Sequence, residues 1–223
     1  MFLTRQSNNF FRQSPTRSLF GSRLIARGSV SSRDFRAAVV FHGNGVYDGT
    51  ECTEAVAMLV GLSRLGAQVQ VFAPDRAQAH VVNHLNGEED TSAERNALQE
   101  SARISRGNVK PLSELAASEH DALLIPGGFG AAKNLCDFGF KGAEMQVEPD
   151  VEQLLRDFRN KEKVIGLTCI APIIAAKVFG EEGVKLTLGG RGDNFPFAGS
   201  LDAAKSFGAD VVEMDVNGVC IDW

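Results

Sequence analysis

Residues 163–180 read KVIGLTCIAPIIAAKVFG, and the pattern of apolar residues changes inside this segment. Val164 to Leu167 form a short apolar run, which predicts a strand buried on both faces of a parallel sheet. From Pro172 the apolar residues take a helical spacing, and Gly180 predicts the end of that helix. Cys169 lies at the corner, near unpaired N–H groups that favour a thiolate. We therefore expect a reactive thiol, with a buried structural cysteine as the alternative.

Apolar runs elsewhere in the chain alternate with helical patterns. The runs are residues 36–41, 68–72, 122–125 and 185–188, and the helical patterns lie near 50–65, 91–105, 150–160 and 172–179. This alternation predicts an α/β fold with right-handed crossovers, a mostly parallel sheet and ligands at the carboxyl ends of its strands. Near the end of the chain, Asn217-Gly218 lies between two alternating runs and predicts a β-hairpin.

The first 33 residues differ in composition from the rest of the chain. They contain six arginines, several serines and no acidic residue, which is typical of a mitochondrial transit peptide. A disordered basic tail is the alternative. We expect residues 1–33 to be a leader and residues 34–223 to form one domain.

Charge and cysteine usage exclude several classes of function. Without the six leader arginines the formal charge falls from −5 to −11, so nucleic acid and anionic membranes are not expected as partners. The four cysteines show no CxxC pairing and no histidine spacing typical of zinc. The sequence therefore predicts free thiols in a reducing compartment, with neither a metal nor a cofactor.

A glycine-rich turn, HGNGVYDGTE at residues 42–51, follows the first predicted strand. Its glycines are spaced GxGxxxG and not GxGxxG, so a dinucleotide site that uses Asp75 as the ribose acid is a weaker alternative. Asp48 and Glu51 have the spacing of a capping box. Glu54 has no such capping role, and its carboxyl group can reach toward the end of a neighbouring strand.

A second glycine-rich turn, PGGFGAAKNL at residues 126–135, follows the third long apolar run. Its glycines allow a sharp turn that exposes backbone N–H groups. Such donors would hold an oxyanion beside the thiol. A plain strand-to-helix turn is the alternative.

The motifs PGGFGAAKNL, CIAP and GVYDGTE together resemble the PfpI-like superfamily, relatives of the class I glutamine amidotransferases. The nearest branch is the sigma cross-reacting, enhancing-lycopene-biosynthesis type, whose eukaryotic members are mitochondrial glutamine amidotransferase-like proteins. The resemblance covers residues 37–222. It implies a flavodoxin-like three-layer sandwich with a nucleophile elbow at Cys169. Relatives continue past the hairpin, so we expect this chain to lack a C-terminal strand and helix.

The resemblance also implies roles for individual residues. Glu54 would be the carboxylic acid that hydrogen-bonds the thiolate, with Glu51 as the second choice. The backbone of Gly128 and Ile170 would supply the oxyanion donors.

One departure from the family pattern concerns histidine. No histidine follows Cys169, so the usual Cys-His-Glu amidase triad is absent and neither glutamine hydrolysis nor proteolysis is expected. His42, at the end of the first strand, is a candidate substitute base.

Two hypotheses for the activity follow. Relatives act as glutathione-independent glyoxalases or deglycases, which implies that Cys169 adds to an α-oxoaldehyde or a glycated substrate in the mitochondrial matrix. The resemblance also implies a homodimer. Alternatively, the protein is a redox sensor or scaffold in which Cys169 is oxidised to a sulfinate held by the same carboxyl group.

Overall fold

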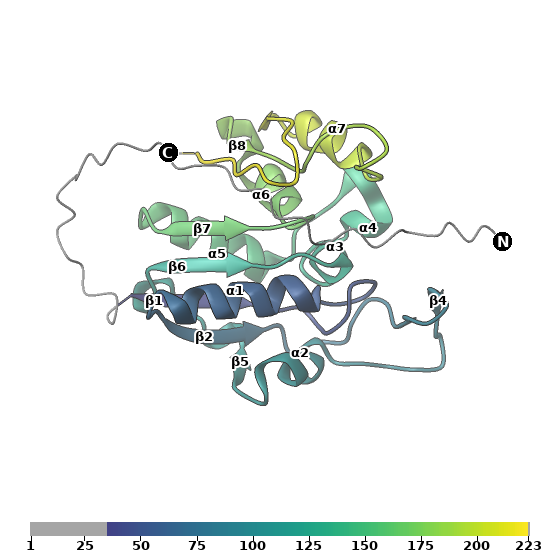
Figure 1. Ribbon diagram of the computed structural model, residues 1–223, viewed down its shortest axis with the longest axis vertical. Coiled ribbons are helices and arrows are strands. Elements are labelled where there is room, and N and C mark those ends of the chain that lie inside the picture. The colour runs from purple at the N-terminus through teal and green to yellow at the C-terminus, as the bar shows by residue number, and fades with distance from the viewer. Residues whose placement is uncertain (1–34, 223) are drawn as a thin grey trace, which may run out of the picture. The chain divides into compact units, whose positions relative to one another are not determined.

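Five parallel strands form the central sheet of the computed structural model, which describes residues 35–222 (Figure 1). The strands are β1 (Arg36–Val40), β2 (Gln68–Ala73), β5 (Val109–Pro111), β6 (Ala122–Ile125) and β7 (Val164–Leu167). Their order across the sheet is β5-β2-β1-β6-β7. Because every pair is parallel, all five carboxyl ends lie along one edge of the sheet. The predicted leader, residues 1–33, lies outside the described residues.

Helices cover both faces of this sheet, as the alternating pattern predicts. One face packs against α1 (Cys52–Arg64) and α2 (Ala97–Ser105), and the other packs against α3 (Phe129–Asn134), α5 (Pro149–Asn160) and α6 (Pro172–Phe179). The short helices are α4 (Phe138–Lys141), α7 (Gly199–Ser206), η1 (Leu112–Glu114), η2 (Ala117–Glu119), η3 (Gly142–Glu144) and η4 (Gly180–Glu182). None of the helices between residues 35 and 222 is long and apolar enough to cross a membrane. Helices on both faces of one parallel sheet confirm the prediction of a flavodoxin-like three-layer sandwich.

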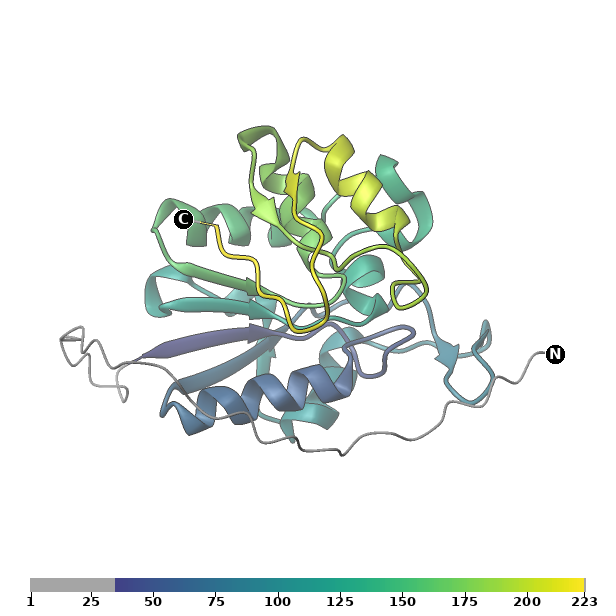
Figure 2. The same ribbon diagram turned by 45° about the horizontal axis from the view of Figure 1, so that its top comes forward.

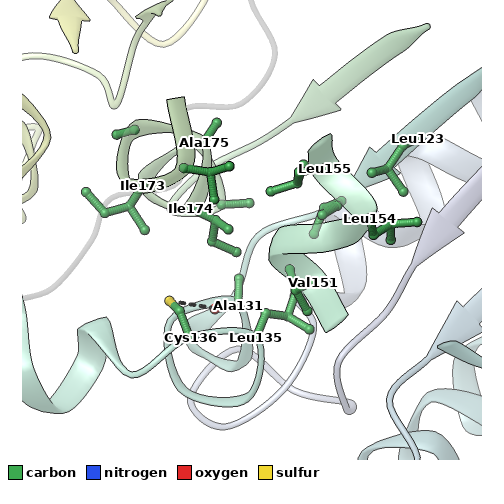
Figure 3. Close-up of a cluster of buried hydrophobic side chains, with 14 of the residues drawn as sticks. Leu123, Ala131, Leu135, Cys136, Val151, Leu154, Leu155, Ile173, Ile174 and Ala175 are labelled. Carbon is green, nitrogen blue, oxygen red and sulfur yellow. Dashed lines mark hydrogen bonds between the residues drawn. The ribbon is translucent and has the colours of Figure 1, made fainter. Parts of the chain in front are cut away.

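Alternating side chains of β1 divide the core into two clusters. Val39 and Phe41 point toward α1, whereas Ala38 and Val40 point toward α5 and α6. The second cluster is the larger, and Figure 3 shows its centre, where Leu155 is fully buried. Burying one leucine stabilises the fold by about 1.5 to 3 kcal/mol.

Strand β7 differs from its prediction. It lies at the edge of the sheet rather than inside it, and Val164 is 58% exposed. The apolar run therefore predicted the position of the strand correctly, but the predicted burial on both faces was too high. The sequence of an edge strand can be as apolar as that of a central strand.

The segment after α6 also departs from the predictions. Strand β8 (Lys185–Leu186) pairs in parallel with β9 (Asp210–Val211) in a separate two-stranded sheet, and a third small sheet pairs β3 (Val82–Asn83) with β4 (Glu88–Glu89). The predicted hairpin at Asn217-Gly218 is wrong. A turn from Asp215 to Gly218 is present, but no strands flank it, and the segment runs on past α7 as irregular chain (Figure 2).

Helix α6 begins where the sequence predicts, with Pro172 in its first turn. It also ends where the sequence predicts, with Gly180 as its C-cap. Gly180 keeps right-handed helical backbone angles, so the chain continues into η4, and Gly183 takes the left-handed conformation that closes η4. Gly180 is small for another reason, since an added Cβ there would lie 2.2 Å from the carbonyl oxygen of Phe207.

Candidate functional site

Cys169 lies in a tight turn between β7 and α6, as the sequence predicts. Its φ is 56°, in the left-handed region that L residues with a side chain rarely adopt. The N–H of Ala171 donates to the carbonyl of Thr168 at 2.9 Å and closes the turn. Holding a cysteine in this conformation costs about 1 to 2 kcal/mol. Interactions elsewhere in the fold offset this cost. Cys169 as a whole residue is exposed.

Glu54 enters the site from the first turn of α1. Its Oε2 accepts a hydrogen bond from the backbone N–H of Gly127 at 2.8 Å and another from the Thr168 hydroxyl group. Gly127 follows β6 and Thr168 follows β7, so the carboxyl group joins the ends of two neighbouring strands. The expectation that Glu54 reaches a neighbouring strand end agrees with this geometry.

The thiol of Cys169 and the carboxyl group of Glu54 both lie close to Gly127, in the space that a side chain at this position would occupy. A Cβ at this position would lie 2.2 Å from the Cβ of Cys169, 2.8 Å from its Sγ and 2.9 Å from Oε2 of Glu54. Real Cβ atoms do not approach other atoms so closely, because packed atoms in proteins keep their van der Waals separation. The thiol and the carboxyl group therefore converge over Gly127, and only glycine leaves room for them.

The surroundings of Cys169 shift its pKa in the direction opposite to the one that favours the predicted thiolate. Burial of the sulfur raises the pKa of Cys169, and the nearby negative charge of Glu54 raises it further, as does a hydrogen bond to that carboxylate. Backbone N–H groups of Gly128 and Ile170 donate to the sulfur and act in the opposite direction. Loss of hydration and the charge of Glu54 thus outweigh the backbone donors, and together they raise the pKa of the Cys169 thiol.

Gly128 and Ile170 thus contact the sulfur itself. Gly128 has a φ of 103°, which suits glycine, and an added Cβ would meet the carbonyl oxygen of Gly49 at 2.3 Å. That these two backbone groups supply the oxyanion donors stays a prediction.

Glu51 serves as the N-cap of α1. Its Oε2 accepts from the N–H of Glu54 at 2.7 Å, and its backbone is extended. Burial alone would raise the pKa of Glu51, but hydrogen bonds from Thr53 and from the backbone outweigh it and lower the pKa. The predicted capping box is therefore wrong. Glu51 does cap α1, but as its N-cap, and Asp48 is buried and accepts from the N–H of Val82 instead.

His42 lies beneath the site and not in it. The ring is fully buried, and Nε2 lies 3.0 Å from the carbonyl oxygen of Pro126. Its Nδ1 lies against Gly130 and has no hydrogen-bond partner. Burial lowers the pKa of His42 to about 4, so the imidazole is neutral and a weak base. Its contact with Pro126 positions the turn that carries Gly127.

Two positioning residues were missed by the sequence reasoning. Thr168 donates to Glu54, and its place directly before the cysteine was a usable signal. Asn134 donates to the carbonyl oxygens of His42 and Asp48 at 2.8 and 2.9 Å, and so fixes the first glycine-rich turn against α3. No sequence signal separates this asparagine from an ordinary helix residue.

The first glycine-rich turn packs against the protein's own side chains. Added Cβ atoms at Gly43 and Gly45 would meet Gln78 and His84 at 2.6 and 2.5 Å, and Asp75 accepts a hydrogen bond from Asn96. These contacts weaken the dinucleotide alternative, since a pyrophosphate needs the same close approach to the backbone. Between residues 35 and 222, no cluster of three or more His, Cys, Asp or Glu side chains could hold a metal ion.

Solved structures share this architecture and define the class as an amidotransferase-like α/β domain. An isoprenoid biosynthesis protein with an amidotransferase-like domain from Ehrlichia chaffeensis is 32% identical, with a TM-score of 0.71 over 81% of this chain and 80% of that chain. A ThiJ/PfpI domain protein from Brachyspira murdochii shares the fold at 14% identity and a TM-score of 0.50, covering 81% of this chain and 80% of its own. No family model matches the sequence.

Curated relatives identify the branch. The human glutamine amidotransferase-like class 1 domain-containing protein 3, mitochondrial, is 49% identical over 82% of this chain and 70% of its own length. The rat ES1 protein homolog, mitochondrial, is 50% identical over 78% of this chain. This chain belongs to the same family of ES1 and glutamine amidotransferase-like class 1 domain-containing proteins. It spans 66% of the rat protein and 70% of the human one.

Proposed function

We propose that the protein converts α-oxoaldehydes to 2-hydroxy acids without glutathione, using Cys169 as nucleophile and Glu54 as the proton-transfer group. The observation that supports this most strongly is the convergence of the thiol and the carboxyl group over Gly127. A thiol in hydrogen-bond contact with a base that other groups orient is the arrangement expected of a nucleophilic site. Gly127 and Thr168 orient the carboxylate here.

The first step forms a carbon–sulfur bond. Glu54 takes the proton of the thiol as the sulfur attacks the aldehyde carbon, and the carbonyl electron pair moves to oxygen. The N–H groups of Gly128 and Ile170 stabilise the developing oxyanion. The raised pKa of Cys169 is compatible with this step, because the proton needs to leave only as the bond forms.

The next steps move a hydrogen between adjacent carbons. Glu54 gives its proton to the oxyanion and then removes the hydrogen from the former aldehyde carbon. Return of that proton to the neighbouring carbon, with transfer of the hydroxyl proton from the former aldehyde oxygen to the former ketone oxygen, yields a 2-hydroxy thioester. Water then hydrolyses the thioester and restores the thiol. Methylglyoxal and one water molecule give lactic acid, and the protein undergoes no net oxidation or reduction.

Formation of lactate from methylglyoxal in the absence of glutathione tests the proposal. We expect turnover by the full chain, none by Cys169→Ser, and unchanged turnover by Cys220→Ser, whose cysteine lies in the irregular segment after β9. A Cys169→Ser variant as active as the parent would contradict the assignment. Glycated peptides, assayed in parallel, separate a deglycase from a glyoxalase.

Redox sensing is the second candidate, because the same exposed sulfur faces two backbone donors and a carboxyl group that would hold a sulfinate. The raised pKa of Cys169 counts against it, since the thiolate is the form that peroxide oxidises. Graded peroxide followed by intact-mass and peptide analysis decides. A sensor requires Cys169 to be oxidised before Cys52 and Cys136.

We also place this activity in the mitochondrion. The support is the basic leader composition together with the word mitochondrial in the names of the human and rat relatives. Fusion of residues 1–33 to a fluorescent protein tests it, and a cytosolic signal would argue against the assignment. The homodimer stays a prediction, which light scattering of the purified chain would check.

A further inference from the structure

A second group of reactive side chains lies outside the Cys169 site. Lys133 on α3 places its Nζ 3.0 Å from Nδ1 of His80, and Nε2 of the same ring lies 3.2 Å from Oε2 of Glu89. A nucleophile, a base within hydrogen-bond distance and a third group that orients the base form the arrangement that activates nucleophiles in enzymes. The three residues come from three separate segments of the chain.

The local structure explains why these residues meet. The antiparallel pair β3–β4 sets Val82 opposite Glu89, so the strand returns Glu89 beside His80, two residues before Val82. Gly87, with a φ of 78°, makes the tight turn between the strands possible. Because Oε2 of Glu89 lies 3.2 Å from Nε2, the carboxylate favours the tautomer with a proton on Nε2, in which Nδ1 is the acceptor that faces the lysine.

The surroundings of Lys133 favour a neutral amine more than an ordinary surface does. Its side chain is half-buried, and the Nζ lies 5.5 Å from the centre of the Phe129 ring. Burial lowers the pKa of Lys133, although the charges of Asp48 and Glu89 raise it. Nζ also donates to the carbonyl oxygen of Tyr47 at 2.9 Å, which fixes the end of the side chain.

From this geometry we infer that Lys133 is a second nucleophile, which forms an imine with small neutral aldehydes. His80 takes a proton from the ammonium group, and the amine nitrogen attacks the carbonyl carbon. The carbonyl oxygen gains two protons and leaves as water, so amine and aldehyde give imine and water. No oxidant or reductant is needed. Glu89 is a positioning residue that holds the imidazole ring.

The charges nearby select the class of aldehyde. Asp48 and Glu89 are the carboxylates whose charges act on Nζ. An aldehyde that carries its own carboxylate is repelled, whereas an uncharged one is not. The exposed aromatic ring of Phe140 is in edge contact with His80 at 5.3 Å and suits an apolar substituent.

Reductive trapping tests this inference. The full chain carrying Cys169→Ser removes the competing thiol, so the result does not depend on the function proposed for that site. Propanal with cyanoborohydride at pH 7 converts each imine to a stable secondary amine, and peptide mass spectrometry locates it. Lys141, on the neighbouring helix and 55% exposed, is the internal reference. We expect Lys133 to react at least about tenfold faster than Lys141.

Two variants separate activation from mere exposure. His80→Gln keeps a hydrogen-bond acceptor but takes up no proton, and should bring the Lys133 rate close to that of Lys141. Glu89→Gln, at the surface, should lower the rate less and move its pH profile. Glyoxylate in place of propanal should lower the ratio of Lys133 to Lys141. A Lys133 rate no greater than that of Lys141, or one unchanged in His80→Gln with Lys141 unaffected, would overturn the proposal.

Discussion

Cys136 and Cys169 lie in opposite surroundings, one in the core beneath α3 and α5 and the other at the elbow between β7 and α6. Burial is the largest cause that raises the pKa of each thiol, to about 12 for Cys136. Around Cys136 the packed side chains are apolar, and its Sγ donates to the carbonyl of Ala131 at 3.4 Å (Figure 3). A backbone N–H of Phe138 also contacts this sulfur, and Asp137 and Glu148 act on it through their charges, without a hydrogen bond to the sulfur. Around Cys169 a carboxylate and two backbone donors face the sulfur. Two thiols with pKa shifts in the same direction therefore differ in whether a neighbouring group can take the proton.

The largest effect should come from Gly127→Ala, because it should leave Cys169, like Cys136, without a neighbouring group that can take the thiol's proton. The added methyl group overlaps Cys169 and Glu54, so the thiol and carboxyl group must separate. We expect lactate formation to fall more than about 1,000-fold, about 4 kcal/mol of lost transition-state stabilisation. Gly61→Ala is the matched control, because no atom lies within 4 Å of its added Cβ. Full activity in Gly127→Ala would refute the convergence.

Leu155→Ala should disturb the core and spare the elbow. The side chain is fully buried among the residues that surround Cys136, so its truncation should cost about 2 to 5 kcal/mol of unfolding free energy. Urea unfolding measures the loss. At temperatures where the variant stays folded, the alkylation rate of Cys169 should equal that of the parent. A matching fall in that rate would show that the two regions are coupled.

Glu54→Gln should make Cys169 easier to ionise. The charge of Glu54 raises the pKa of the thiol, so its removal should move the pH midpoint of iodoacetamide alkylation to a lower value. At the same time lactate formation should fall, because an amide cannot take the proton. A midpoint that rises or stays would indicate a thiolate paired with a carboxylic acid in the parent, the state expected from the sequence.

Cys136→Ala should have the smallest effect. The thiol behaves as a small apolar group, so we expect a loss of about 1 kcal/mol in unfolding free energy and no change in alkylation at Cys169. In the folded parent, Cys136 should resist alkylation over the pH range in which Cys169 reacts. Modification of Cys136 first would reverse the comparison.

The elements that carry the elbow were predictable because their patterns are local. Val164 to Leu167 and Ala122 to Ile125 match their strands residue for residue, and the helix after Pro172 begins where proline allows. The peripheral strands were not predictable in the same way. Lys185–Leu186 pairs with a strand 25 residues later, and no local period encodes that partner. Helix α3 and strand β5 were not predicted either, because elements of six and three residues are too short to show a periodic pattern.

The candidate site was also predictable from the sequence only in part. Cys169 and Glu54 could be named from their positions at a strand end and a helix start, and the family resemblance supplied Gly128 and Ile170. The protonation state could not be predicted, because it depends on how far the sulfur is desolvated and on where the Glu54 carboxylate lies. The link from Lys133 through His80 to Glu89 joins segments that only the folded chain brings together.

The left-handed backbone at Cys169 sets folding and reactivity against each other at one position. Glycine or asparagine would adopt that conformation with less strain than cysteine does. A selection for heat resistance alone should therefore enrich those two residues at position 169 and discard the thiol. Applied to the whole chain, such a selection would identify the strained residues that are needed for activity and not for stability.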